Sequence, residues 1–186
     1  SKMINLTDVS LRRVDIGDSD RLIKWRNSEH IRSKMINSNI VKSEDHKKWL
    51  KNTLNDSSSQ WFVVNYNKQT SGVIYITNII NCDKTSTWGM YVDGKYMNSV
   101  VGVLMEIVAI DKMVFDLGIR KIWGETLETN KKLLSMHQKF GFDIEGVYKK
   151  QIYRDNTYLD VYRIALFSTK WKTIRNDLMR SLGVKE

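Results

Sequence analysis

A long apolar helix between two strands constrains the fold of this chain more than any other feature. Apolar residues recur at helical spacing from about Val100 to Leu117, and Gly118 follows where a helix commonly ends. Few charged residues are available to face water from this helix: Glu106, Asp111, Lys112 and Asp116. Strands are predicted on either side, at Thr85–Val92 and Arg120–Leu127. This order predicts a parallel crossover in which the helix packs on a sheet.

The rest of the chain adds strands and helices and predicts a mixed α/β fold. Further strands are expected at Val9–Val14, Trp61–Tyr66, Ser71–Ile80, Phe142–Ile152 and Thr157–Phe167. Further helices are expected from Asp18 toward Ile31, from Ser43 through Leu54, and from Asn130 to Gly141. No linker or repeat interrupts the chain, which favours one domain over residues 1–186, with a core at about 9–168 and a basic amphipathic tail at 170–186.

Composition limits the compartment and the partners. A single cysteine, Cys82, excludes an internal disulfide framework and a cysteine-rich zinc site. The three histidines form no metal-binding motif, so we expect no metal. No apolar run reaches the roughly 20 residues of a membrane span, and the expected location is the cytoplasm. The net charge of +9 fits a solvated basic surface or an anionic small molecule, and the basic residues show no nucleic-acid-binding motif.

Glu125 is the first candidate for chemistry. Strand alternation places it on one face with Trp123 and Leu127. A carboxylate between two large apolar side chains would be desolvated, and its pKa would rise toward that of a general base. The alternative is a strand glutamate paired with a nearby Lys or Arg.

His137 and the turn before the long helix are two further candidates. His137 shares an apolar helix stripe with Leu133 and Phe140, and it is either a satisfied core histidine or a proton donor in a cleft. The segment 93–102 ends at a predicted helix start, where free N–H groups bind anions. It matches neither of the common glycine-rich phosphate motifs.

The order of the elements and one motif resemble the GNAT acetyltransferase family. Residues 130–142, NKKLLSMHQKFGF, resemble the family signature Asn-x-x-x-x-x-x-Tyr-x-Lys-x-Gly-Phe, and the resemblance extends over roughly residues 9–168. It implies an acetyl-CoA-dependent acyltransferase. The implied fold is a mixed, mostly antiparallel sheet of about seven strands flanked by four helices, with two strands splayed in a V.

A narrower resemblance concerns the N-acetyltransferases of the pseudaminic-acid pathway. The similar segments are Trp25-Arg26-Asn27, Ile31-Arg32, Met35, His46-Lys47-Lys48-Trp49, Ser86-Thr87-Trp88-Gly89 and Leu127-Glu128-Thr129-Asn130. Those enzymes acetylate the 4-amino group of a UDP-linked 4-amino-4,6-dideoxy sugar. The resemblance implies substrate contacts from Arg26, Asn27, Met35, His46 and Trp49. The alternatives are a core role for Trp49 and an ordinary surface role for Arg26.

The family resemblance also implies how acetyl-CoA is held. The implied cofactor contacts are Met90, Tyr91 and Val92 at a strand end, Asn98, Ser99, Val100 and Gly102 in the following turn, and Asn130, Lys132 and Lys139 beyond it. Two departures stand out. Of the family's Gln/Arg-x-x-Gly-x-Gly/Ala turn only Gly102 remains, and His137 occupies the position of a tyrosine that protonates the departing thiolate.

These residues together predict direct acetyl transfer in a ternary complex. Glu125 would accept the amine proton through a water held by Thr77, a main-chain N–H of Met90 or Val92 would stabilise the developing oxyanion, and His137 would protonate the thiolate. This arrangement requires that two strands part and that Glu125 and His137 face the same slot. Side chains on opposite faces of the sheet would refute it.

Three other functions remain open at the level of sequence. They are acetylation of a protein N-terminus or a polyamine, a non-catalytic CoA-binding module, and nucleic-acid binding through the basic tail. A cationic acceptor favours an acidic cleft, whereas the charge of +9 favours an anionic one. The oligomeric state also stays open, with a homodimer among the expected forms.

Overall fold

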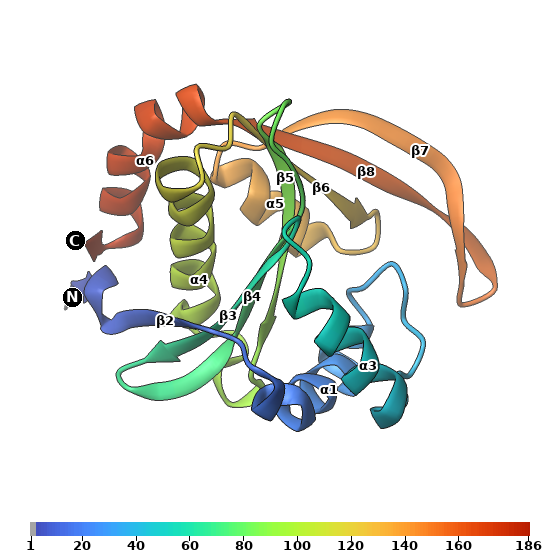
Figure 1. Cartoon of the computed structure of the whole chain (residues 1–186). Helices are drawn as coiled ribbons and strands as arrows, with labels where there is room; N and C mark the ends of the chain where they lie inside the picture. The colour runs from blue at the N-terminus through green and yellow to red at the C-terminus, as the bar shows by residue number, and fades with distance from the viewer. Residues whose placement is uncertain (1–2) are drawn as a thin grey trace.

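The computed structural model describes residues 3–186 and contains one seven-stranded sheet. The strands are β2 (Val9–Arg13), β3 (Gln60–Tyr66), β4 (Gln69–Ile80), β5 (Thr85–Val92), β6 (Lys121–Leu127), β7 (Asp143–Arg154) and β8 (Thr157–Phe167). Their order across the sheet is β2-β3-β4-β5-β6-β8-β7, and neighbours are antiparallel except β5 and β6. A short parallel pair, β1 (Ile4–Asn5) with β9 (Val184–Lys185), brings the two ends of the described chain together (Figure 1).

Helices cover both faces of this sheet (Figure 1). They are α1 (Ser19–Asn27), α2 (Glu29–Arg32), α3 (Ser43–Leu54), α4 (Val100–Asp111), α5 (Lys131–Lys139) and α6 (Ser168–Leu182), with a π-helical turn at Lys112–Asp116 after α4. One core lies between the sheet and α4, α5 and α6, and a second lies between the sheet and α1 and α3. We call these two sides the α4 face and the α1 face. The predicted mixed, mostly antiparallel fold is confirmed.

Two predicted helices end differently in the structure. The helix expected to continue toward Ile31 breaks at Ser28, which is extended (ψ 144°) and donates its hydroxyl hydrogen bond to the Trp25 carbonyl. The long helix leaves α-geometry after Asp111, and Gly118 terminates the segment with φ +64°. Both segments keep the predicted positions, so the crossover from β5 through α4 to β6 stands.

The predicted basic tail belongs to the core. Its residues form α6, and the indole of Trp171 is fully buried against Phe140, with ring centroids 6.2 Å apart. The indole N–H donates to Asp111 at 2.9 Å, and Arg175 also binds that carboxylate. The amphipathic character was predicted correctly, but the core extends past residue 168 because Leu178 and Met179 also pack into it.

Candidate active site

The strands β5 and β6 are joined only at their first three residues. Thr85, Ser86 and Thr87 pair with Lys121, Ile122 and Trp123. Beyond Thr87 the two strands are not paired, whereas each keeps its other neighbour, β4 or β8. The predicted parting of two central strands is therefore confirmed. Main-chain groups along the parted halves have no ladder partner on that side and can bind a third molecule, except the Val92 carbonyl, which lies 3.1 Å from Nε2 of His30.

Two glycines at the parting point allow aromatic rings to lie across the strands. A Cβ on Gly89 of β5 would lie 2.1 Å from the Tyr75 ring on the α1 face. A Cβ on Gly124 of β6 would lie 3.0 Å from the Trp88 ring on the α4 face. Neither ring could keep its place beside a larger residue. The parting point is therefore lined by one tyrosine and one tryptophan, on opposite faces.

Aromatic side chains form most of the α1 face beside this point. Trp61 stacks on Tyr75 with ring centroids 4.4 Å apart, and Trp49 meets Trp61 edge-on at 5.0 Å. Burial raises the pKa of Tyr75 and of Tyr91, which keeps both phenols neutral. Trp49 is 41% exposed, so it is a wall of this surface and not a fully buried core anchor.

Two arginines that form no ion pair within residues 3–186 bind adjacent carbonyls of the same loop. Arg26 is 8% exposed, and its Nη2 donates to the Asn37 carbonyl at 2.8 Å. Arg154, from the end of β7, donates from Nη2 to the adjacent Ile36 carbonyl at 2.8 Å. The Nη1 atoms of both guanidinium groups are buried and have no hydrogen-bond partner within residues 3–186. The alternative of an ordinary surface role for Arg26 is wrong, and Arg154 is a candidate that the sequence did not reveal.

The loop between α2 and α3 closes one side of this region. The Asn27 amide accepts from the Val41 N–H and donates to the Val41 carbonyl, both at 2.8 Å. Met35 packs against the α1-face core. Asn27 thus holds the loop in place, and its contact with a substrate stays a prediction.

His46 lies at the inner side of this face. It is buried, its Nδ1 lies 3.2 Å from the Ser19 hydroxyl, and its ring contacts Trp49 at 5.2 Å. Burial, and secondarily the charge of Arg26, lowers the pKa of His46 below 6.5. His46 is therefore neutral near pH 7. It can support Trp49 or take part in hydrogen bonding, but it does not supply positive charge to an anion.

Glu125 does not have the environment that the sequence predicted. It lies on the α1 face with Trp123, as alternation requires, but it is exposed at the surface. Its carboxylate is 3.3 Å from Nη1 of Arg163, whose guanidinium lies 3.7 Å above the Trp123 ring. The expectation of a desolvated carboxylate is wrong, because Trp123 is covered by Arg163 and leaves Glu125 paired in solvent.

The expected unit of Thr77, Glu125 and His137 is also wrong. Thr77 pairs with Thr87 on β4 and β5, so it lies two strand spacings from β6, about 10 Å. His137 lies on the α4 face, against Trp88, whereas Glu125 lies on the α1 face. The two side chains therefore do not share a slot on one side of the sheet.

His137 is paired with a carboxylate that the sequence placed in water. Its Nδ1 lies 2.5 Å from Oε1 of Glu106, and Glu106 is fully buried inside α4. Trp88 and Phe142 contact the imidazole, with ring centroids 5.4 and 5.6 Å away. Glu106 was expected to face solvent, but α5 covers that side of α4. Its position three residues after Val103 and four before Ile110 indicates the buried stripe.

The predicted cofactor turn has features that fit an anion. Ser99 caps α4 by accepting from the Val101 N–H at 3.2 Å, and Asn98 turns the chain with φ +59°. A Cβ added to Gly102 would have Val92 Cγ2 as its nearest neighbour, at 3.9 Å, so this side of the helix start is open. These features suit a diphosphate at the helix N-terminus.

The side chain of Asn130 is a second feature that suits a bound cofactor. Its Nδ2 is buried and has no hydrogen-bond partner within the described chain, in the loop between β6 and α5. A buried amide donor without a partner costs stability, and a carbonyl of a bound molecule would satisfy it. The exposed Lys132 and Lys139 remain predicted contacts.

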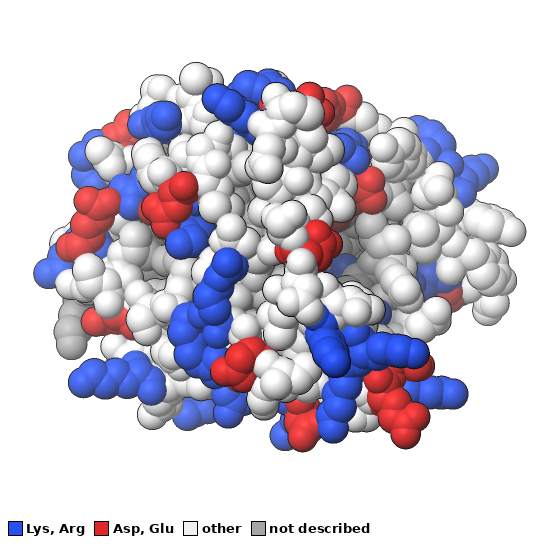
Figure 2. All heavy atoms as spheres, viewed as in Figure 1, with Lys and Arg blue, Asp and Glu red and all other residues white. Residues whose placement is uncertain are grey.

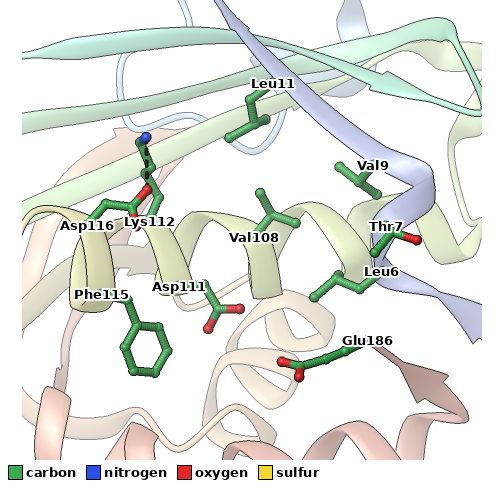
Figure 3. Close-up of a pocket in the computed structure, with 10 residues that line it drawn as sticks. All are labelled: Leu6, Thr7, Val9, Leu11, Val108, Asp111, Lys112, Phe115, Asp116 and Glu186. Carbon is green, nitrogen blue, oxygen red and sulfur yellow. Dashed lines mark ion pairs between the residues drawn. The ribbon is translucent and has the colours of Figure 1, made fainter.

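Two hollows lie away from the parted strands. The one in Figure 3, about 440 Å³, lies between β2 and α4, with Leu11, Val108 and Phe115 among its lining residues and Glu186 at its edge. The other, about 630 Å³, lies between Arg13 and the end of α3, beside Trp61. Neither holds the histidine or the arginine pair.

Charge and composition of the described residues add three findings. On the side drawn in Figure 2, basic and acidic side chains are interspersed and form no single basic band. No helix within residues 3–186 combines the length and the apolar character of a bilayer span. In the same range no three His, Cys, Asp or Glu side chains gather as a metal site would require.

The parting of β5 and β6 is the feature that the resemblance to an acetyltransferase led us to expect. The chain belongs to the GNAT family, because residues 11–162 match the Acetyltransferase (GNAT) domain. It is an acyltransferase that uses acetyl-CoA and acts on an amine.

Individual relatives give the comparison more detail. The chain is 27% identical to Acetyltransferase PseH of Campylobacter jejuni strain 81-176 over 144 residues, which cover 77% of this chain and 85% of the relative. It is 19% identical to the spermidine N(1)-acetyltransferase of Escherichia coli K12 over 118 residues, 63% of each chain. The spermidine N-acetyltransferase of Vibrio cholerae, solved with CoA and spermine, superposes with a TM-score of 0.83 at 18% identity, over 89% of this chain and 99% of that one.

Proposed function

We propose that this enzyme acetylates an amino sugar carried on a nucleoside diphosphate. The specific acceptor is UDP-4-amino-4,6-dideoxy-N-acetyl-β-L-altrosamine, acetylated on its 4-amino group in pseudaminic acid biosynthesis. The similarity to PseH at 27% identity supports this choice. The cytoplasmic location and the homodimer stay predictions.

Arg26 and Arg154 are the observation on which the proposal of an anionic acceptor depends. Each has a buried Nη1 without a partner, and neither forms an ion pair within the described residues. A guanidinium fork matches phosphate oxygens, and two forks bound to adjacent carbonyls suit a diphosphate. A polyamine would bring more positive charge to the same place and would be repelled.

The aromatic wall supports the sugar nucleotide as well. Trp49 presents a half-open ring beside Trp61 and Tyr75, and a uracil base or the apolar sugar methyl can stack on it. The acceptor would thus lie on the α1 face, with its amine directed at the parting of β5 and β6.

The parted strands would hold the acetyl donor. Main-chain groups of Met90, Tyr91 and Val92 would bind the pantetheine arm, and an N–H of Met90 or Val92 would stabilise the oxyanion. The turn from Asn98 to Gly102 would hold the diphosphate of the donor. His137 on the α4 face is the proposed acid, and the amine of the acceptor loses its proton to solvent, because Glu125 is exposed, paired with Arg163 and on the opposite face.

The test is thiol release from acetyl-CoA with three acceptors: the UDP-linked 4-amino sugar, spermidine and a peptide with a free N-terminus. We expect turnover with the sugar nucleotide and none with spermidine or the peptide. Arg154→Gln should raise the KM for that acceptor at least about tenfold, whereas Arg21→Gln, which removes the same charge from an exposed site, should not.

Polyamine acetylation is the second candidate. The 19% identity to the E. coli spermidine enzyme favours it. Turnover of spermidine without turnover of the sugar nucleotide would replace the proposed acceptor by a polyamine. Thiol release with none of the three would overturn both candidates and point to a different amine as the acceptor.

A further inference from the structure

Glu106 is a buried carboxylate with one partner. It is fully enclosed in α4 among core residues such as Met105 and Ile107, its Oε1 lies 2.5 Å from the imidazole, and its Oε2 has no partner within the described chain. Burying a carboxylate this way costs more free energy than burying an apolar side chain of similar size. Packing alone therefore does not account for a glutamate at this position.

The contact determines which nitrogen of His137 is free. With Glu106 ionised, its carboxylate can only accept a hydrogen bond, and Nδ1 then carries the hydrogen between the two groups. The other nitrogen, Nε2, makes no hydrogen bond within the described chain, and it is not among the enclosed polar atoms that lack a partner. Trp88 and Phe142 contact the ring from two directions, which restricts its rotation. Nε2 is thus the nitrogen available to a bound molecule.

The position of the ring is close to the reaction. Trp88, which the imidazole contacts, directly follows Thr87, the last residue of β5 paired with β6. His137 is therefore held beside the point where the strands part, at which the thioester of the donor would lie. The Glu106 carboxylate, the His137 imidazole and its accessible Nε2 thus follow one another from the core toward this point.

We infer that Glu106 is a positioning residue, which holds His137 so that Nε2 returns the proton to the departing thiolate. This inference rests on the proposed acetyl transfer. When the amine attacks the acetyl carbon, the C–S bond breaks and its electron pair stays on sulfur. His137 enters this step as the imidazolium, protonated on both nitrogens; the sulfur takes the proton from Nε2, and the ring becomes the neutral imidazole with Nδ1–H still bound to Glu106. The proton lost by the amine passes to solvent, and Nε2 is later protonated again from solvent.

The matched variants are Glu106→Gln and Asp111→Asn. Both remove a carboxylate from α4, and Asp111 binds Trp171 and Arg175, away from the proposed reaction. We expect Glu106→Gln to lower kcat at least about tenfold with each KM changed less than about threefold. Asp111→Asn should lower thermal stability and leave kcat unchanged.

A His137→Tyr background separates positioning from folding. A tyrosine donates its own phenolic proton and needs no carboxylate on a second nitrogen, so Glu106→Gln should then change kcat by less than about threefold. Equal losses of kcat in both backgrounds would show a structural role and overturn the inference. Full kcat after Glu106→Gln in the unmodified background would overturn it too.

A measurement on the unmodified protein covers the case in which the variant does not fold. The ¹⁵N chemical shifts of His137 distinguish hydrogen on Nδ1 from hydrogen on Nε2 in the neutral ring. We expect the Nδ1–H form, and the Nε2–H form would overturn the inference. This result does not depend on the acceptor, and if spermidine replaces the sugar nucleotide, kcat is measured with spermidine, because the thiolate leaves in the same way.

Discussion

Replacing Gly102 by alanine should change stability and donor binding in opposite directions. Gly102 is the third residue of α4, and the added methyl would lie 3.9 Å from Val92 Cγ2, an ordinary van der Waals distance. Alanine in a helix is about 0.5–1 kcal/mol more stable than glycine. For a chain of this length that corresponds to a rise of about 1–4 °C in Tm.

The same methyl should weaken the binding of CoA. It would stand where the diphosphate of the donor approaches the first N–H groups of α4, and we expect at least about a tenfold higher Kd, or about 1.4 kcal/mol. The assays are thermal melting without ligand and calorimetric titration with CoA. Gly146→Ala is the control, since nothing lies within 4 Å of its Cβ position in β7. A raised Tm with an unchanged Kd for CoA would refute the placement of the diphosphate at this turn.

Three other predictions concern the two faces of the sheet. Gly89→Ala should lower Tm by about 2–12 °C, because its Cβ would displace the Tyr75 ring, whereas Gly146→Ala should not; equal melting of both would contradict the close contact. The free energy of unfolding measured in urea should fall as pH drops below 6.5, because the pKa of His46 is lowered in the folded state, which therefore binds a proton on His46 less readily than the unfolded state does. The variant His46→Gln should flatten this pH dependence of stability between about pH 5 and pH 8. An unchanged slope in the variant would contradict the role of His46. Trp171→Ala should cost about 3–5 kcal/mol in chemical denaturation, and a loss below about 1 kcal/mol would contradict its place in the core.

Periodic segments were predictable, and interruptions of them were less so. The crossover from β5 to β6 follows from apolar spacing that local sequence carries. The break at Ser28 has no proline or glycine to announce it, and it depends on a serine hydroxyl that binds the Trp25 carbonyl. The fold class therefore follows from pattern, whereas the division between α1 and α2 depends on one local hydrogen bond.

The site was predictable in part, for a similar reason. His137 follows from the family signature, but its partner Glu106 is found only by placing a carboxylate on the apolar stripe of α4. Arg154 lies 118 residues from Ile36, and no local pattern connects them. The burial predicted for Glu125 failed because Arg163 comes from a different strand, whose register the sequence does not specify.

The short pairing between β5 and β6 has a mechanical consequence. Three residue pairs join one group of four strands, β2 to β5, to a second group of three strands, β6, β8 and β7. The segment that contains α4 is the covalent link between the two groups. A molecule bound between the unpaired halves of β5 and β6 would contact both groups of strands and hold them together. Ligand binding therefore affects the cooperativity of unfolding. Without ligand, the two groups of strands can separate between β5 and β6 at less free energy than global unfolding requires. A bound ligand raises the free energy of that separation by its binding free energy.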